Sequence, residues 1–317
     1  MNAVPARVDS FRHEALFYAG QDRFVAGTLP FVLDGLEKGE AVLVVESTPR
    51  IALLREALGA DANQVEFADM AAVGSNPARI VPAWQEFVER HSNQRRLRGI
   101  GEPIWAERPP SELAECQRHE SLLNVAFAGG PPWWLLCPYD TEGLDGSVVE
   151  EAKRSHPFVW EPAGQTTSDR YRGLDASGAP FDWPLEPPPA SAVRFGFDGV
   201  TLGDVRWFIG HYGNAAGLRP REAGDLVAVI NEIATNSVRH GGGHGELSTW
   251  NDGHAVICEV RDTGRYDRPL ADRRRPGPEA GAPRGLWLAN QLCDLVQIRS
   301  LPQGTVVRVH KYLPHAA

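Results

Sequence analysis

Apolar runs of strand length alternate with helical stripes along the first 160 residues. The runs lie at residues 41–46, 97–102 and 133–137, and the stripes lie at residues 49–58, 77–90 and 111–128. Ser111 stands where a serine would cap the last of these helices. Strands that alternate with helices predict an α/β fold, with a parallel sheet covered by helices on both faces.

The last 120 residues show a different pattern. Leu226, Val229, Ile230 and Ile233 repeat at helical spacing. Alternating strand patterns follow at residues 245–250 and 254–261, around the turn residues Asn251-Asp252-Gly253. A helix is expected over residues 284–294, and a second hairpin is expected from 295–300 and 305–312. Two hairpins and two helices predict a mixed α/β domain of a second kind.

A segment rich in proline and glycine separates the two patterns. It covers residues 161–190 and ends in Pro187-Pro188-Pro189, a composition typical of a connector with a stiff end. We therefore expect a first domain at residues 1–160, the connector at 161–190, and a second domain at 191–317.

Composition and charge limit the classes of function. The chain has 317 residues, a net charge of −9 and a pI of about 5.6, which argue against a broad nucleic-acid-binding surface. The four cysteines are widely spaced, so their spacing indicates neither a zinc site nor a disulfide framework. There is no signal peptide and no run of 18 apolar residues, which predicts a soluble cytoplasmic protein without membrane contact.

Polar residues follow one edge of the predicted helix around residue 232. Glu232, Asn236, Arg239 and His240 are three or four positions apart and share that edge. A carboxylate beside an amide oxygen is suited to activating a hydroxyl group and to ligating Mg²⁺. An ordinary solvated helix edge is the alternative.

Two further motifs suit a nucleotide. Asp262 ends a strand pattern and can accept a hydrogen bond from an adenine amino group, while Gly264 allows a base to approach the backbone. Gly285 opens a helix whose free N–H groups and positive end favour phosphate. Arg284 could contact phosphate or could be a solvated loop residue. A plain turn and a helix boundary are the alternatives for the two motifs.

These motifs, in this order, resemble the ATP-binding domain of gyrase-type ATPases, Hsp90, histidine kinases and MutL. The similarity covers about residues 190–313 and is strongest to the anti-sigma-factor serine kinases. It implies an α/β-sandwich fold of the histidine-kinase-like type, ATP and Mg²⁺ as cofactors, Glu232 as catalytic base and Asn236 as Mg²⁺ ligand. The other residues implied in nucleotide binding are Arg239, His240, Asp262, Gly264, Arg284, Gly285, Leu286 and Thr305. Two positions depart from the family pattern: Tyr266 replaces a second glycine, and Ala282-Pro283-Arg284 replaces a glycine-rich lid. The nearby run Arg273-Arg274-Arg275 is expected to be solvated, and contact with nucleotide phosphate or an acidic partner is the alternative.

The first domain carries polar residues at or near the ends of its expected strands. Glu46, Glu102 and Asp140 stand at strand ends, and His13, His119-Glu120 and Cys137 stand nearby in the pattern. Ligands bind preferentially at the carboxyl ends of parallel strands, so these residues predict a small-molecule pocket. Helix caps and satisfied buried polar groups are the alternative.

Several runs of the first domain resemble the sensory domain named after methanogen and dichloromethane-responsive regulators. They lie at residues 11–18, 35–40, 101–105, 119–124 and 136–140, and the similarity spans about residues 10–158. It implies a sensory module and leaves the identity of the signal open.

Together, the two resemblances imply a signal-responsive anti-sigma factor. Its partners would be a sigma factor, an antagonist protein phosphorylated on serine or threonine, and a small-molecule signal, with no direct nucleic-acid contact; the resemblance also allows a homodimer. A sensor histidine kinase is one alternative, but residues 161–205 contain no histidine and no long heptad pattern. A non-catalytic ATP-binding clamp for the sigma factor is the other.

Overall fold

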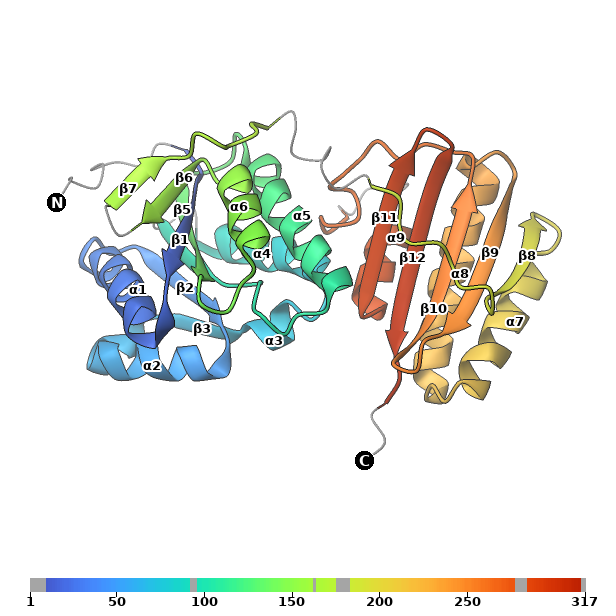
Figure 1. Ribbon diagram of the computed structural model, residues 1–317, viewed down its shortest axis with the longest axis horizontal. Coiled ribbons are helices and arrows are strands. Elements are labelled where there is room, and N and C mark those ends of the chain that lie inside the picture. Colours follow the sequence, from blue (N-terminus) through green and yellow to red (C-terminus); the bar gives the residue numbers. More distant parts are fainter. Residues whose placement is uncertain (1–9, 92–95, 162–163, 175–182, 277–283, 315–317) are drawn as a thin grey trace. The chain divides into compact units, whose positions relative to one another are not determined.

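The computed structural model describes residues 10–91, 96–161, 164–174, 183–276 and 284–314. The chain separates into two compact units, Met1–Ala179 and Pro180–Ala317 (Figure 1). Within the described parts of the chain, no helix combines the length and the apolar character needed to cross a membrane.

A seven-stranded sheet forms the centre of the first unit. Its strands follow the order β3-β2-β4-β5-β1-β6-β7, and all neighbours are parallel except the antiparallel pair β6–β7. The predicted parallel α/β fold is therefore confirmed. The strands are β1 (Arg12–Tyr18), β2 (Ala41–Glu46), β3 (Glu66–Asp69), β4 (Leu97–Gly101), β5 (Trp133–Asp140), β6 (Phe158–Glu161) and β7 (Gly164–Thr167).

Helices cover both faces of this sheet. They are α1 (Gly20–Glu37), α2 (Thr48–Leu58), α3 (Met70–Val73), α4 (Ile80–His91), α5 (Pro110–Phe127) and α6 (Gly146–Ser155), with short 3₁₀ turns at Gly59–Gln64 and Pro77–Arg79. Gly35 of α1 lies against the Arg98 side chain, whereas the ring of Trp84 in α4 lies against Gly99. Successive strand residues point to opposite faces, so α1 and α4 lie on opposite sides of the sheet.

Three details of the first unit differ from the sequence-based expectation. Helix α5 begins at Pro110, so Ser111 lies inside its first turn and caps nothing. Strand β5 continues through Pro138. The pairing of β5 with β4 ends before this proline, at Leu136, so the missing N–H of Pro138 removes no hydrogen bond between β5 and β4. Strand β7 pairs with β6 and extends the sheet into the segment that was expected to be a connector.

The second unit is an antiparallel sheet with its helices packed on one face. The strands are β8 (Val193–Asp198), β9 (His244–Asn251), β10 (Ala255–Asp262), β11 (Leu295–Leu301) and β12 (Gly304–Tyr312), in the order β11-β12-β10-β9-β8. The helices are α7 (Leu202–Ala215), α8 (Pro220–His240) and α9 (Gly285–Leu292). Both predicted hairpins are confirmed, as is the α/β-sandwich architecture (Figure 1).

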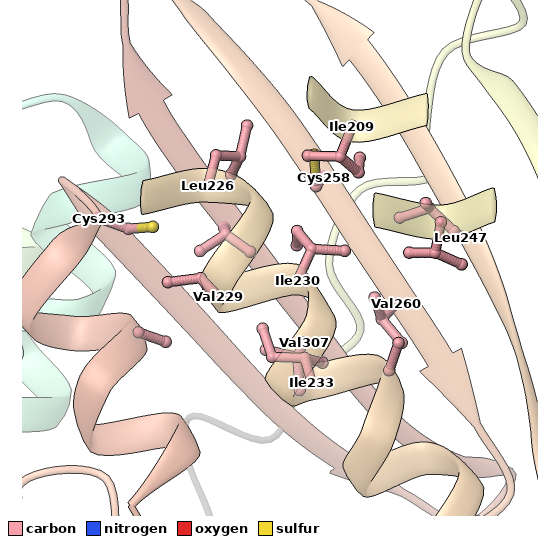
Figure 2. Packing of buried hydrophobic residues seen from close by; sticks show 14 of the residues in the cluster. Ile209, Leu226, Val229, Ile230, Ile233, Leu247, Cys258, Val260, Cys293 and Val307 are labelled. Carbon is pink, nitrogen blue, oxygen red and sulfur yellow. The ribbon is translucent and has the colours of Figure 1, made fainter. Parts of the chain in front are cut away.

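The apolar stripe of α8 holds this unit together. Leu226, Val229, Ile230 and Ile233 are buried in one cluster with residues of the sheet, and Figure 2 shows these side chains packed together. Burial of each such side chain contributes about 1.5–3 kcal/mol. Because this stripe fixes the rotation of α8 about its axis, it also fixes where the neighbouring polar edge of the helix points.

Candidate functional site

The start of α9 lies against the polar edge of α8. A Cβ atom placed on Gly285 would be 3.2 Å from Asn236 Nδ2 and 3.3 Å from Glu232 Oε2, so the backbone at Gly285 lies close to both side chains. Both side chains are half-buried. A carboxylate and an amide thus adjoin the N–H groups and positive end of a helix, an arrangement suited to a phosphate chain and its counterion.

The carboxylate of Asp262 is held at the end of β10 by two hydrogen bonds. The Ser237 hydroxyl donates to Oδ2 at 2.6 Å, and the backbone N–H of Gly264 donates to Oδ1 at 2.8 Å. Each carboxylate oxygen can accept more than one hydrogen bond. A fixed, half-buried acceptor of this kind can also receive an amino group of a ligand.

Glycines let the backbone pass close to Asp262. A Cβ atom on Gly264 would be 2.7 Å from the carbonyl oxygen of His240, and one on Gly241 would overlap with the Asp262 side chain. The Thr305 hydroxyl donates to the carbonyl of Gly264 at 2.9 Å and fixes the turn. These close contacts fix the Asp262 carboxylate between the end of α8 and the turn after β10.

The structure therefore brings together most of the residues expected at a nucleotide site. Glu232, Asn236 and Gly285 form one group, and Asp262, Gly264 and Thr305 form a second; Ser237 joins the two through α8. Leu286 packs against the hydrophobic core. The remaining three, Arg239, His240 and Arg284, have exposed side chains, and their binding roles stay predictions.

The two departures from the family pattern have different outcomes. Tyr266 donates its hydroxyl to Asp272 at 3.1 Å, and Asn290 of α9 donates to the Asp272 carbonyl at 3.0 Å. These bonds tie the segment to α9, and the next residue, Arg273, is 1% exposed. The expectation that the arginine run is solvated is therefore wrong for Arg273, although Arg274 and Arg275 are exposed. Ala282 and Pro283 lie outside the described residues.

In the first unit, acidic residues meet at the carboxyl ends of the central strands. Arg50, in the first turn of α2, forms ion pairs with Glu102 at 2.9 Å and with Asp140 at 3.4 Å. The Tyr18 hydroxyl donates to Glu102 at 2.8 Å. Glu46 is fully buried beside Glu102. Glu46, Glu102 and Asp140 could be predicted to come together because each stands at the end of an expected strand. Nothing in the sequence pattern marked Arg50 as a member of this group.

Burial disfavours the charged forms of the two glutamates. Burial raises the pKa of Glu102 to about 8, against the opposing effect of the positive Arg50. Burial and the adjacent Glu102 carboxylate together raise the pKa of Glu46 well above its usual range. At neutral pH the folded pair of Glu46 and Glu102 therefore retains protons that the two carboxyls lose when the chain unfolds.

The contribution of this pair to the stability of the first unit should consequently fall as the pH rises from about 4.5 to about 8. Between these values Glu46 and Glu102 bind fewer protons in the unfolded chain than in the folded chain, so at these two sites raising the pH favours unfolding. Glu46→Gln, which cannot ionise, should reduce this loss, and the exposed Glu37→Gln should not. Urea unfolding at about pH 5 and about pH 8 measures the difference. An unchanged pH dependence in Glu46→Gln would contradict the assignment.

Two of the other three residues of the expected sensory pocket also lie side by side. His13 and Cys137 are adjacent within the sheet, with Nε2 and Sγ 3.3 Å apart, and His119 is buried on α5. A hollow of about 800 Å³ opens instead toward α1, lined by apolar side chains that include Leu16, Trp134 and Leu136. None of the six expected residues is among the described residues that line it, which also include charged residues such as Arg23, Asp34 and Lys153.

Comparisons with known proteins match a different family to each of the two units. Residues 12–157 match the MEDS family, the methanogen/methylotroph, DcmR sensory domain. Residues 198–311 match the histidine kinase-like ATPase domain. Among solved structures, Acinetobacter baumannii histidine kinase AdeS is 13% identical with a TM-score of 0.22, covering 39% of this chain and 68% of that chain. No curated protein matches the chain. The two family matches place a MEDS domain before a kinase-like ATPase domain.

Proposed function

We propose that this chain is a signal-responsive anti-sigma factor that binds ATP and phosphorylates a serine or threonine of an antagonist protein. The observation that carries the proposal is the position of Glu232 and Asn236 against Gly285 at the start of α9. That arrangement places a candidate base, a candidate metal ligand and a phosphate-binding helix end at one point of the domain.

Asp262 would select adenine in this account. Its carboxylate is already oriented by Ser237 and by the Gly264 N–H, so it can accept the exocyclic amino group with little rearrangement. The backbone N–H groups at Gly285 and Leu286 would meet the phosphates. Asn236 would ligate Mg²⁺, which when bound neutralises charge on the phosphate oxygens.

Glu232 would take the proton of the attacking hydroxyl group. As the hydroxyl oxygen bonds to the γ-phosphorus, the bond from that phosphorus to the β,γ-bridging oxygen breaks, and ADP leaves. The carboxylate then holds the proton that the serine or threonine has lost. A phosphorylated antagonist carries added negative charge, which weakens a docked interface through repulsion and desolvation.

The segment before the ATPase domain favours a serine or threonine acceptor over histidine. A sensor histidine kinase presents its acceptor histidine on a helical hairpin before this domain. Between β7 and α7, the described residues 168–174 and 183–201 form turns, extended backbone and β8, but no helix. The MEDS match supports regulation by a small molecule, and the sigma factor follows from the resemblance to anti-sigma-factor kinases.

Purification of the full chain from its native cells, with Mg·ATP present, would recover the protein partners for a transfer assay. We expect label from γ-labelled ATP to pass to a co-purified protein and to survive acid, as phosphoserine and phosphothreonine do. Label on this chain that is lost in acid would support the histidine-kinase alternative. ATP binding with a retained sigma factor but no transfer would support the non-catalytic clamp.

A further inference from the structure

Four side chains with metal-binding atoms meet inside the first unit. They are His13 of β1, Glu120 of α5, Cys137 of β5 and His156, which follows α6. One ligand atom from each lies within 4.8 Å of the others, and each residue is at most 1% exposed. Four separate elements of the fold thus contribute to one buried centre.

The distances within this cluster suit a single small cation. Glu120 Oε2 lies 3.1 Å from Nε2 of His13 and 3.1 Å from Nε2 of His156. His13 Nε2 lies 3.3 Å from Cys137 Sγ. Two ligands about 2.0–2.3 Å from a tetrahedral zinc ion are roughly 3.3–3.8 Å apart, so small adjustments would place an ion between them.

The Nδ1 atom of each histidine lies beside a hydrogen-bond acceptor outside the cluster. His156 Nδ1 lies 2.8 Å from the carbonyl of Ala152, and His13 Nδ1 lies 3.3 Å from Oδ1 of Asn124. The Asn124 amide nitrogen donates to the carbonyl of Ser155 at 2.7 Å, which fixes its oxygen toward His13. Both Nδ1 atoms are therefore donors, and both Nε2 lone pairs point into the cluster, as in histidines that bind metal.

The second carboxylate oxygen of Glu120 is also consistent with a bound metal ion. Glu120 Oε1 is buried and has no hydrogen-bond partner among the described residues. Buried carboxylate oxygens are normally satisfied by donors or by a metal ion. A divalent ion with one thiolate, one carboxylate and two neutral imidazoles forms a centre of zero net charge, which lowers the cost of burying it.

We propose that His13, Glu120, Cys137 and His156 bind one zinc ion that cross-links β1, α5, β5 and the end of α6. Mixed nitrogen, sulfur and oxygen ligands suit zinc, and four protein ligands leave no open coordination position. The proposed ion is therefore structural and stabilises the sensory domain from inside. The inference is independent of the ATP site and goes beyond the function proposed above.

Metal analysis of the full chain, expressed in zinc-supplemented medium, tests this proposal. We expect about one zinc per chain after gel filtration. Expression with cobalt should give tetrahedral ligand-field bands and a thiolate-to-cobalt charge-transfer band. Wild-type protein with neither zinc nor cobalt would overturn the proposal, and a stoichiometric copper centre would overturn the choice of zinc.

Variants locate the site without depending on one mutant that folds. Cys137→Ser should lose the charge-transfer band, and His156→Ala should reduce zinc content at least tenfold. Cys116→Ala removes another buried cysteine of the same unit that lies outside the cluster, and should keep both signals. Loss of the band in Cys116→Ala but not in Cys137→Ser would contradict the ligand assignment. ATP affinity of the folded variants should be unchanged, which separates this test from the ATP site.

Discussion

Glu232→Ala should bind Mg·ATP nearly as tightly as the wild type and transfer phosphate about 10²–10⁴-fold more slowly. The carboxylate would act on the attacking hydroxyl group and not on the adenine, so its loss should appear in the chemical step. Single-turnover transfer to the antagonist, with ATP affinity measured in parallel, separates the two effects.

Two matched variants sharpen this test. Asn236→Ala removes the proposed Mg²⁺ ligand and should weaken both ATP binding and transfer. Glu246→Ala removes an exposed carboxylate from β9 of the same domain and should change neither. Transfer by Glu232→Ala at the wild-type rate would rule out Glu232 as the base.

Gly304→Ala should destabilise the ATPase domain by about 3–5 kcal/mol and abolish ATP binding at ordinary concentrations. Gly304 has a φ of +137°, and a Cβ atom there would overlap with the backbone carbonyl of Asp262. The alanine therefore forces β12 away from the strand end that carries the proposed adenine acceptor. Urea unfolding and ATP titration measure the two consequences.

Gly243→Ala is the control for backbone conformation alone. Gly243 also has a positive φ, of +88°, but a Cβ atom there would meet nothing within 4 Å. We expect the free energy of unfolding to fall by about 1–2 kcal/mol, with ATP binding retained. Equal destabilisation by the two substitutions would show that the close approach to Asp262 contributes nothing.

Local patterns allowed much of the ATPase domain to be predicted. The stripe from Leu226 to Ile233 identifies the buried face of α8, and the turn Asn251-Asp252-Gly253 fixes a hairpin between sequence neighbours. The order of the seven strands in the first unit could not be predicted in the same way. It depends on which buried strands pair across long connections, and similar apolar runs do not distinguish their neighbours.

The candidate sites follow the same distinction. Glu232 and Asn236 are one helical turn apart, so their shared edge follows from sequence spacing alone. His13, Glu120, Cys137 and His156 are brought together only by the fold, and no Cys-x-x-Cys spacing marks them. Arg273 was misassigned because a run of three arginines carries no signal that one of them is buried, and its burial follows only from the fold.

Calorimetric titration of Mg·ATP into the wild type and Asp262→Asn tests the central claim that the second domain binds ATP through this site. The account predicts saturable one-to-one binding by the wild type and an affinity about 10–100-fold lower in Asp262→Asn, because an acceptor facing the adenine amino group becomes a potential donor. No binding by the folded wild type, or equal affinity in the two proteins, would contradict it.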